Sequence, residues 1–163
     1  MKTVVNSMHL KRIPVSADAQ AVVGGALQSV LSDLVAMTNY TKQAHWSVVG
    51  RRFSPVHELL DAIFATLSNQ TDEAAERLGA LNIAPDGRIT TVARTTQVEE
   101  YPEGAVVDTD AVSHVADRLA GVIERMRAHE AEVRDFDPVS DDMLIGFLGE
   151  LEKHLWMLQA QEA

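Results

Sequence analysis

The sequence has no cysteine and little glycine or proline. These shortages limit the kinds of cross-link, metal site and fold that the protein can have. Without cysteine, the 163-residue chain has no disulfide, no iron–sulfur cluster and no thiolate metal site. With only nine glycines and five prolines, helix-forming residues dominate the chain, which favours an all-α fold. The excess of 24 acidic over 14 basic side chains gives a net charge of −10. This charge disfavours nucleic-acid binding by the folded body and favours attraction of cations.

The sequence also shows no long hydrophobic run of the kind found in signal peptides or membrane-spanning helices. The N-terminus lacks the apolar run of a signal peptide, and no stretch approaches the roughly 20 apolar residues that span a bilayer. We therefore expect a cytoplasmic protein with no membrane segment. The length corresponds to one domain with a substantial core.

Apolar residues at three- and four-residue spacing predict four long helices. We expect a tail over residues 1–15 and a single domain over residues 16–163. The predicted helices cover residues 16–48, 55–81, 109–136 and 137–159. Ser54 followed by Pro55, and Asp137 followed by Pro138, are typical of a helix start, because proline is tolerated at the first helical position.

The connection from residue 82 to residue 108 is too long for a hairpin between neighbouring helices. It is long enough to cross the length of a bundle, with a short helical turn near residues 96–100. The sequence therefore predicts an all-α, ferritin-like four-helix bundle with one long crossover. Gly24 and Gly25 inside the first helix indicate either close approach of another element or a frayed start, and Trp156 is expected in the core.

One histidine and three carboxylates share a face of the second predicted helix. At about 100° per residue, His57, Asp61, Asp72 and Glu76 fall at roughly 0°, 40°, 60° and 100° on the helical wheel. They cannot bind one metal ion within a single chain, because Asp61 and Asp72 are about 16 Å apart along the axis. Alone, each pair is more often a surface ion pair or a solvated face.

A second, antiparallel copy of the helix removes this difficulty, because residue numbers 57 and 76 have the same sum as 61 and 72. A two-fold axis between Thr66 and Leu67 would bring His57 beside Glu76 of the partner subunit, and Asp61 beside Asp72 of the partner subunit. Two identical half-sites result, as in an isologous dimer.

His45, one helix earlier, is the candidate fifth ligand. Imidazole and carboxylates without sulfur suit iron or manganese better than structural zinc. An open position on Fe(II) would let an oxidant approach. Trp46 next to His45 is interpreted either as a packing residue or as an indole that intercepts stray radicals.

A conventional ferritin site inside one subunit needs Glu-x-x-His. None of the six histidines has a glutamate three residues before it, so that site is disfavoured. The acidic side chains at the third-to-fourth helix corner have two open interpretations, as capping charge or as an iron entry pore on a three-fold axis; they are Asp135, Asp137, Asp141 and Asp142.

Three segments carry a resemblance to a known family. K-Q-A-H-W-S-V-V-G-R-R-F, V-H-E-L-L-D and T-D-E-A-A-E-R-L-G-A-L-N-I-A-P are similar to the Dps family, the DNA-binding proteins from starved cells, also called mini-ferritins. The resemblance extends over nearly the whole chain. It implies a ferritin-like four-helix subunit with a short helix in the crossover, and twelve copies in a hollow shell.

Matched residue by residue, the resemblance implies that His45, His57 and Asp61 of one subunit bind iron together with Asp72 and Glu76 of its neighbour, with the family's tryptophan at Trp46. It further implies a ferroxidase that oxidises Fe(II), typically with hydrogen peroxide or else with oxygen, and stores ferric mineral. The expected partner is a second copy of the chain within a homododecamer.

The chain departs from family members that bind DNA through a lysine-rich tail. Its N-terminal tail has only Lys2, Lys11 and Arg12, and Q-A-Q-E-A at the C-terminus has no basic residue. Twelve short tails could still act by multivalency. The alternative functions are therefore a nucleoid-associated DNA-binding protein with secondary iron chemistry, and a shell adapted to another metal-dependent reaction such as hydrolysis.

Overall fold

The computed structural model describes residues 7–162, and residues 1–6 and 163 lie outside this description. The described elements, in chain order, are α1 (Ala17–Ser47), β1 (Val48–Val49), α2 (Phe53–Ala80), α3 (Ile89–Thr95), β2 (Val106–Val107), α4 (Asp108–Val133) and α5 (Pro138–Gln159).

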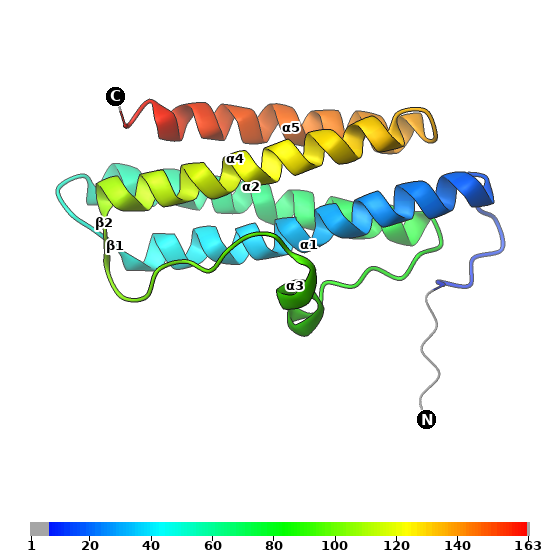
Figure 1. The fold of residues 1–163 in the computed structure, drawn as a ribbon, viewed down its shortest axis with the longest axis horizontal. Coiled ribbons are helices and arrows are strands. Elements are labelled where there is room, and N and C mark those ends of the chain that lie inside the picture. Colours follow the sequence, from blue (N-terminus) through cyan, green and yellow to red (C-terminus); the bar gives the residue numbers. More distant parts are fainter. Residues whose placement is uncertain (1–6, 163) are drawn as a thin grey trace.

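Four long helices form a bundle of two antiparallel pairs, α1 with α2 and α4 with α5 (Figure 1). The crossover leaves the end of α2 at one end of the bundle and enters α4 at the other. The short helix α3 lies on this crossover, outside the bundle and against α1 (Figure 1). The predicted all-α bundle with one long crossover and a short helix on it is confirmed.

A two-stranded parallel pair joins the crossover to the α1–α2 connection. Val48 pairs with Val106, and Val49 pairs with Val107. The pairing was not foreseen from the sequence, because two-residue strands have no detectable periodicity. It holds the start of α4 beside the turn that links the two helices carrying the candidate histidines.

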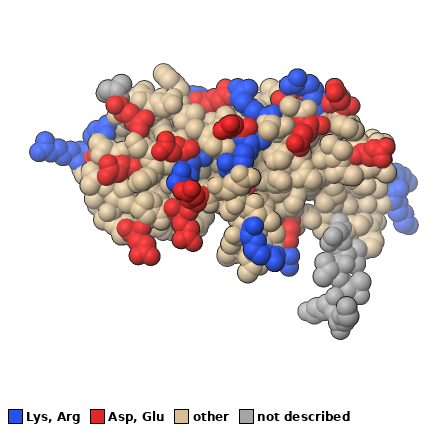
Figure 2. Space-filling model, viewed as in Figure 1, with Lys and Arg blue, Asp and Glu red and all other residues tan. Residues whose placement is uncertain are grey.

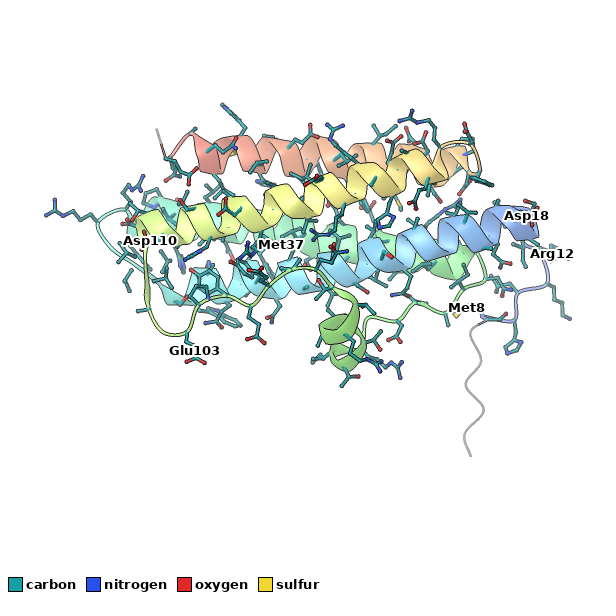
Figure 3. All side chains as sticks on the ribbon, viewed as in Figure 1. Met8, Arg12, Asp18, Met37, Glu103 and Asp110 are labelled. Atoms are coloured by element: carbon teal, nitrogen blue, oxygen red, sulfur yellow. The ribbon has the colours of Figure 1, made fainter. Side chains whose placement is uncertain are left out.

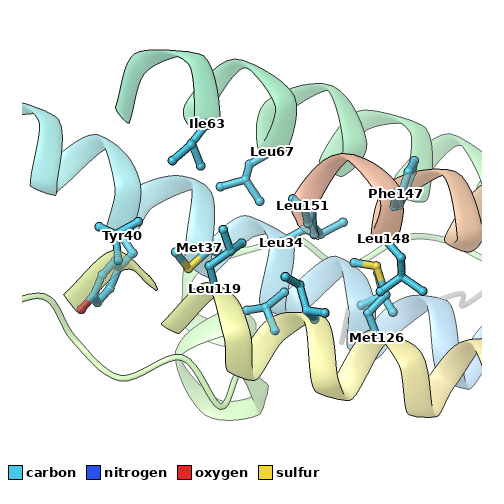
Figure 4. Close-up of a cluster of buried hydrophobic side chains, with 14 of the residues drawn as sticks. Leu34, Met37, Tyr40, Ile63, Leu67, Leu119, Met126, Phe147, Leu148 and Leu151 are labelled. Carbon is cyan, nitrogen blue, oxygen red and sulfur yellow. The ribbon is translucent and has the colours of Figure 1, made fainter. Parts of the chain in front are cut away.

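The core lies between the four long helices and is made mainly of leucine, valine, isoleucine and methionine, together with several alanines. Figure 4 shows Leu34 and Met37 of α1 facing Leu119 of α4, with Ile63 and Leu67 of α2 above them. These residues recur every three or four positions, which places them on one side of each helix. The predicted apolar stripes are therefore confirmed.

Helix α1 corrects the expectation that no stretch could span a membrane. It is long and apolar enough by length and composition, with a mean hydropathy of 1.4 over 18 residues. More than half of that window (56%) is buried inside the bundle. Alanines and small polar residues interrupt the strongly apolar side chains of α1 without adding much charge, so no long apolar run stands out in its sequence. The apolarity of α1 is that of a core helix.

Three helices have bounds that differ from the prediction, and one of them is α4, which ends at Val133 instead of near residue 136. Helix α2 begins at Phe53, and Arg52 rather than Ser54 occupies its N-cap position. Helix α3 covers Ile89–Thr95 instead of residues 96–100. The carboxylate of Asp86 binds Arg88 at 2.5 Å and Thr91 at 3.0 Å, and these bonds start α3 earlier in the chain.

Trp156 was expected in the core, and this expectation was wrong. Its side chain is 65% exposed on α5, whereas Leu151 and Leu158 of the same helix are buried. At 100° per residue, Trp156 lies 140° from Leu151 and 160° from Leu158, on the opposite side of the helix. Size and hydrophobicity suggested burial, but the register of α5 decided otherwise.

The tail folds against the end of α2 from Ser7 onwards. The Ser7 hydroxyl donates to Asn82 Oδ1 at 3.1 Å, and the Leu10 N–H donates to the same atom at 2.8 Å. Figure 3 shows Arg12 near the start of α1 and Met8 farther from it, beside the crossover that follows α2. The division of the chain into a tail of residues 1–15 and a domain of residues 16–163 stays a prediction.

Gly24 and Gly25 have different structural reasons. A Cβ on Gly24 would lie 2.2 Å from Cδ1 of Ile83, so the glycine allows the turn after α2 to approach α1 closely. A Cβ on Gly25 would meet no heavy atom within 4 Å. Of the two interpretations left open by the sequence, close approach accounts for Gly24.

We expect Gly25→Ala to stabilise the protein by about 0.5–1 kcal/mol, because alanine restricts the unfolded chain and favours helix. Gly24→Ala should be about 1–2 kcal/mol less stable than Gly25→Ala, because its methyl group must displace the end of Ile83. Chemical denaturation of both variants measures the difference. Equal stabilisation by both alanines would contradict the close-approach interpretation.

Candidate metal centre

Two histidines meet where α1 ends and α2 begins. His45 lies in the last turn of α1, and His57 is the fifth residue of α2. Their rings stack with centroids 3.6 Å apart and an interplanar angle of 22°. His45 is buried and His57 is half-buried. The structure thus brings together two of the predicted ligands from separate helices of one chain.

Each of these histidines is held by the main chain of the other. Nδ1 of His45 is 3.1 Å from the carbonyl oxygen of His57, and Nδ1 of His57 is 2.9 Å from the carbonyl oxygen of His45. Because a carbonyl oxygen only accepts, both Nδ1 atoms carry a proton and donate. In the neutral form of each ring, this bond leaves the lone pair on Nε2. A ring N–H bound to a carbonyl is the usual support of a metal-ligating histidine.

Asp61 lies beside the histidine pair and is held by a lysine. Oδ1 of Asp61 is 2.7 Å from Nζ of Lys42 and 3.8 Å from Nδ1 of His45. Nζ of Lys42 also lies 4.6 Å from the ring centroid of Phe64, a cation–π contact. The hydrogen bond from Lys42 lowers the pKa of Asp61, so the carboxylate is anionic at neutral pH. The Asp61 side chain is 56% exposed and reaches the surface.

Asp72 and Glu76 lie on the same helix but away from the other three candidate ligands. Both are exposed, and neither forms an ion pair within residues 7–162. Eleven residues of helix separate Asp61 from Asp72, a distance of about 16 Å along the axis. In the described part of the chain, no three histidine or acidic side chains are arranged to hold a metal ion. A single subunit stacks His45 on His57 and places Asp61 next to His45, and it leaves Asp72 and Glu76 apart from them.

The surface of α2 between these two groups is exposed and built from small side chains. Its exposed residues are Ala62, Ala65, Ser68 and Asn69. Thr66, halfway along α2, points away from this strip, and its hydroxyl bonds Nε2 of His154 on α5 at 2.8 Å. Small side chains let a second helix approach closely, and they lie where the predicted two-fold axis would pass.

Trp46 does not pack into the core of the subunit. Its side chain is 67% exposed, next to the buried His45. Packing inside one chain is therefore excluded as its role. Contact with a second subunit and interception of radicals both remain compatible with this position.

Sequence reasoning missed Lys42 and Phe64, although a signal for Lys42 was present. Lys42 precedes His45 by three residues, and this spacing puts both side chains on one face of α1. Arg77, next to Glu76 in α2, is partly buried and binds Asp137 at 2.5 Å. This bond also ties Asp137 to the bundle, so this member of the acidic corner has a structural partner.

The ferritin-like domain family matches residues 25–162 of the chain. The chain is 31% identical to the DNA protection during starvation protein of Agrobacterium fabrum, over 93% of this chain and 94% of that protein. It is 35% identical to the protein of the same name from Mycolicibacterium smegmatis, over 91% of this chain and 81% of that protein.

Solved structures agree with these sequence matches. The structure of Dps from Microbacterium arborescens in the high iron form superposes with a TM-score of 0.87 and 28% identity, over 92% of this chain and 98% of that chain. DpsA14 from Streptomyces coelicolor superposes with a TM-score of 0.89 and 28% identity, over 96% of this chain and 94% of that chain.

Proposed function

Since this chain belongs to the Dps family of ferritin-like proteins, we propose that it is a ferroxidase and iron store. The proposed sites lie between subunits related by a two-fold axis, and the proposed assembly is a hollow homododecamer. His45, His57 and Asp61 would bind Fe(II) together with Asp72 and Glu76 of the partner subunit. Ferric mineral would collect in the cavity of the shell, with protection against oxidative damage as the benefit.

The observation that carries this proposal is the mutual anchoring of the two histidines. Each Nδ1 is bound to the carbonyl oxygen of the other residue, so both Nε2 lone pairs are free to bind a metal ion. The anionic carboxylate of Asp61 lies beside the pair. This donor set suits Fe(II), which takes imidazole and carboxylate ligands.

The proposed reaction transfers electrons from iron to peroxide. Two Fe(II) ions each give one electron to one hydrogen peroxide molecule, whose O–O bond breaks. With two water molecules, the products are two ferric oxyhydroxide units and four protons. The chain's residues hold the Fe(II) and orient it, and the solvent and exposed carboxylates take up the protons. Because peroxide receives two electrons together, no hydroxyl radical is released.

Replacing His57 and Asp61 together with alanine should reduce peroxide-dependent Fe(II) oxidation to the rate without protein. The reason is that each half-site would lose two of its five ligands. Stopped-flow absorbance of ferric product measures the rate, and size-exclusion chromatography checks that the oligomer is retained. The control is His9→Ala with Asp18→Ala; Asp18 lies at the start of α1, at the other end of the bundle from the α1–α2 turn (Figure 3), and His9 lies in the segment before α1. Unchanged kinetics in the first variant would reject the proposal.

DNA binding is not part of this proposal. The names of the curated relatives refer to DNA protection, but this chain has a net charge of −10 and few basic residues in its tail. Lys2 lies outside the described residues. Figure 2 shows acidic and basic side chains interspersed over the visible face, without one gathered basic patch. Phosphate neutralisation needs such a patch or a basic tail.

We also propose a cytoplasmic location, where Fe(II) is kept reduced and available. The same site could in principle activate water for hydrolysis. That alternative would need a pocket for an organic substrate beside the histidines, and the described cavities lie elsewhere, along α1 and α3 and near Gly24.

A further inference from the structure

The turn between α1 and α2 is fastened to α4 by one buried carboxylate. Asp108 is the first residue of α4, directly after β2, and is only 4% exposed. Its Oδ2 accepts the backbone N–H of Arg52 at 2.6 Å. Arg52 is the N-cap residue of α2. The bond therefore joins the start of α4 to the start of the helix that carries His57.

The turn is shaped around this carboxylate. Gly50 has φ +134°, a conformation that favours glycine, and a Cβ there would lie 2.3 Å from Oδ2 of Asp108. The side chain of Arg52 reaches past the carboxylate, with Nε 3.9 Å from Oδ1 of Asp108. Its Nη1 donates to the carbonyl oxygen of Gln161 at 2.7 Å. The segment that follows α5 is thus also bound to the α1–α2 turn.

The α1–α2 turn that Asp108 holds lies between the two histidines in the sequence. His45 precedes β1 by three residues, and His57 follows Arg52 by five. The reciprocal bonds between the histidines require a particular rotation and distance of α1 relative to α2. Five residues of turn, 48–52, set that relation. Pairing with β2 holds residues 48 and 49, and the hydrogen bond to Asp108 holds Arg52.

We propose that Asp108 is a positioning residue for the metal centre, an inference that rests on the function proposed above. Its carboxylate closes the α1–α2 turn and so holds the stacked rings of His45 and His57 in place, with the Nε2 atom of each ring left to bind a metal ion. Asp108 itself is no ligand, because it is buried and its Oδ2 is engaged by Arg52.

Asp33 offers a matched comparison within the same bundle. It is also buried, at 9% exposure, and its Oδ2 binds Nε of Arg125 at 2.6 Å. Its Oδ1 accepts from Thr96 and from the N–H of Gln97, so it ties the crossover to α1. It has no bond to the α1–α2 turn within the described residues. Loss of Asp33 therefore removes a buried carboxylate without releasing the histidines.

The test is a titration of the assembled full-length protein with Co²⁺, followed by its visible absorption. Asp108→Ala should weaken Co²⁺ binding by about 10- to 100-fold, the usual loss when a group that orients ligands is removed. Asp108→Asn should recover most of the affinity, because its amide oxygen still accepts from Arg52. Asp33→Ala should lower the melting temperature and leave Co²⁺ affinity within about twofold of wild type.

Wild-type affinity in Asp108→Ala, or an equal loss in Asp33→Ala, would overturn the assignment. Should Asp108→Ala fail to fold, Gly50→Ala displaces the same carboxylate with its methyl group and must show the same loss; normal Co²⁺ affinity there overturns it too.

The failure of this inference is distinguishable from the failure of the proposed function. If wild-type protein binds no Co²⁺, the proposed metal centre fails. In that case, amide hydrogen exchange in a peptide covering residues 48–56 still tests whether Asp108 holds the α1–α2 turn in place. Exchange should be faster in Asp108→Ala and normal in Asp108→Asn, and exchange that does not change in Asp108→Ala overturns the role of Asp108.

Discussion

Subunits with His57→Ala and subunits with Asp72→Ala, each inactive alone, should recover about a quarter of the wild-type ferroxidase rate when they assemble together in equal amounts. Random pairing makes about half of the two-fold dimers mixed. In a mixed dimer one half-site lacks both residues, whereas the other has His57 from one chain and Asp72 from its partner. Half of the dimers are mixed, and one of the two half-sites in each mixed dimer is intact. A quarter of all half-sites is therefore active.

Co-expression of two differently tagged chains, followed by purification through both tags, provides the mixed oligomer. The rate of Fe(II) oxidation with hydrogen peroxide is then compared with that of each single variant. The control is a mixture of His57→Ala with Asp61→Ala subunits. Both changes fall on the same side of the proposed site, so every half-site stays damaged and no activity should return. Recovery in both mixtures, or in neither, would contradict a site shared between subunits.

Ala65→Arg should abolish Fe(II) oxidation although all five proposed ligands are unchanged. Ala65 is exposed in the middle of α2 and, in the proposed dimer, lies against Ser68 of the partner subunit. Two arginines near the axis would add volume and like charge where the helices must approach closely. We expect the oligomer to dissociate and the five ligands to separate.

Sedimentation velocity should show the mass of a single chain for Ala65→Arg, and circular dichroism should show an unchanged helix content. Ala131→Arg, at an exposed position of α4, is the matched control and should keep both the oligomer and its activity. A stable oligomer of Ala65→Arg with full activity would mean that α2 does not form the shared surface.

The candidate ligands on α2 could be predicted from the sequence, but the residues that surround them could not. Helical periodicity depends only on residues three or four positions apart, so the stripe of His57, Asp61, Asp72 and Glu76 follows from the sequence alone. Lys42 approaches Asp61 from another helix. That contact depends on how α1 packs against α2, which no local pattern encodes.

The sequence by itself determined the four long helices, the long crossover and the candidate ligands, because alternation of apolar and polar residues is a local property of the chain. The tertiary structure alone decided the exposure of Trp156, the early position of α3 and the close approach at Gly24. It alone decided the mutual anchoring of His45 and His57 and the bond from Arg52 to Asp108. These features join residues distant in the chain, and they form only when burial of the whole core fixes the helices in register.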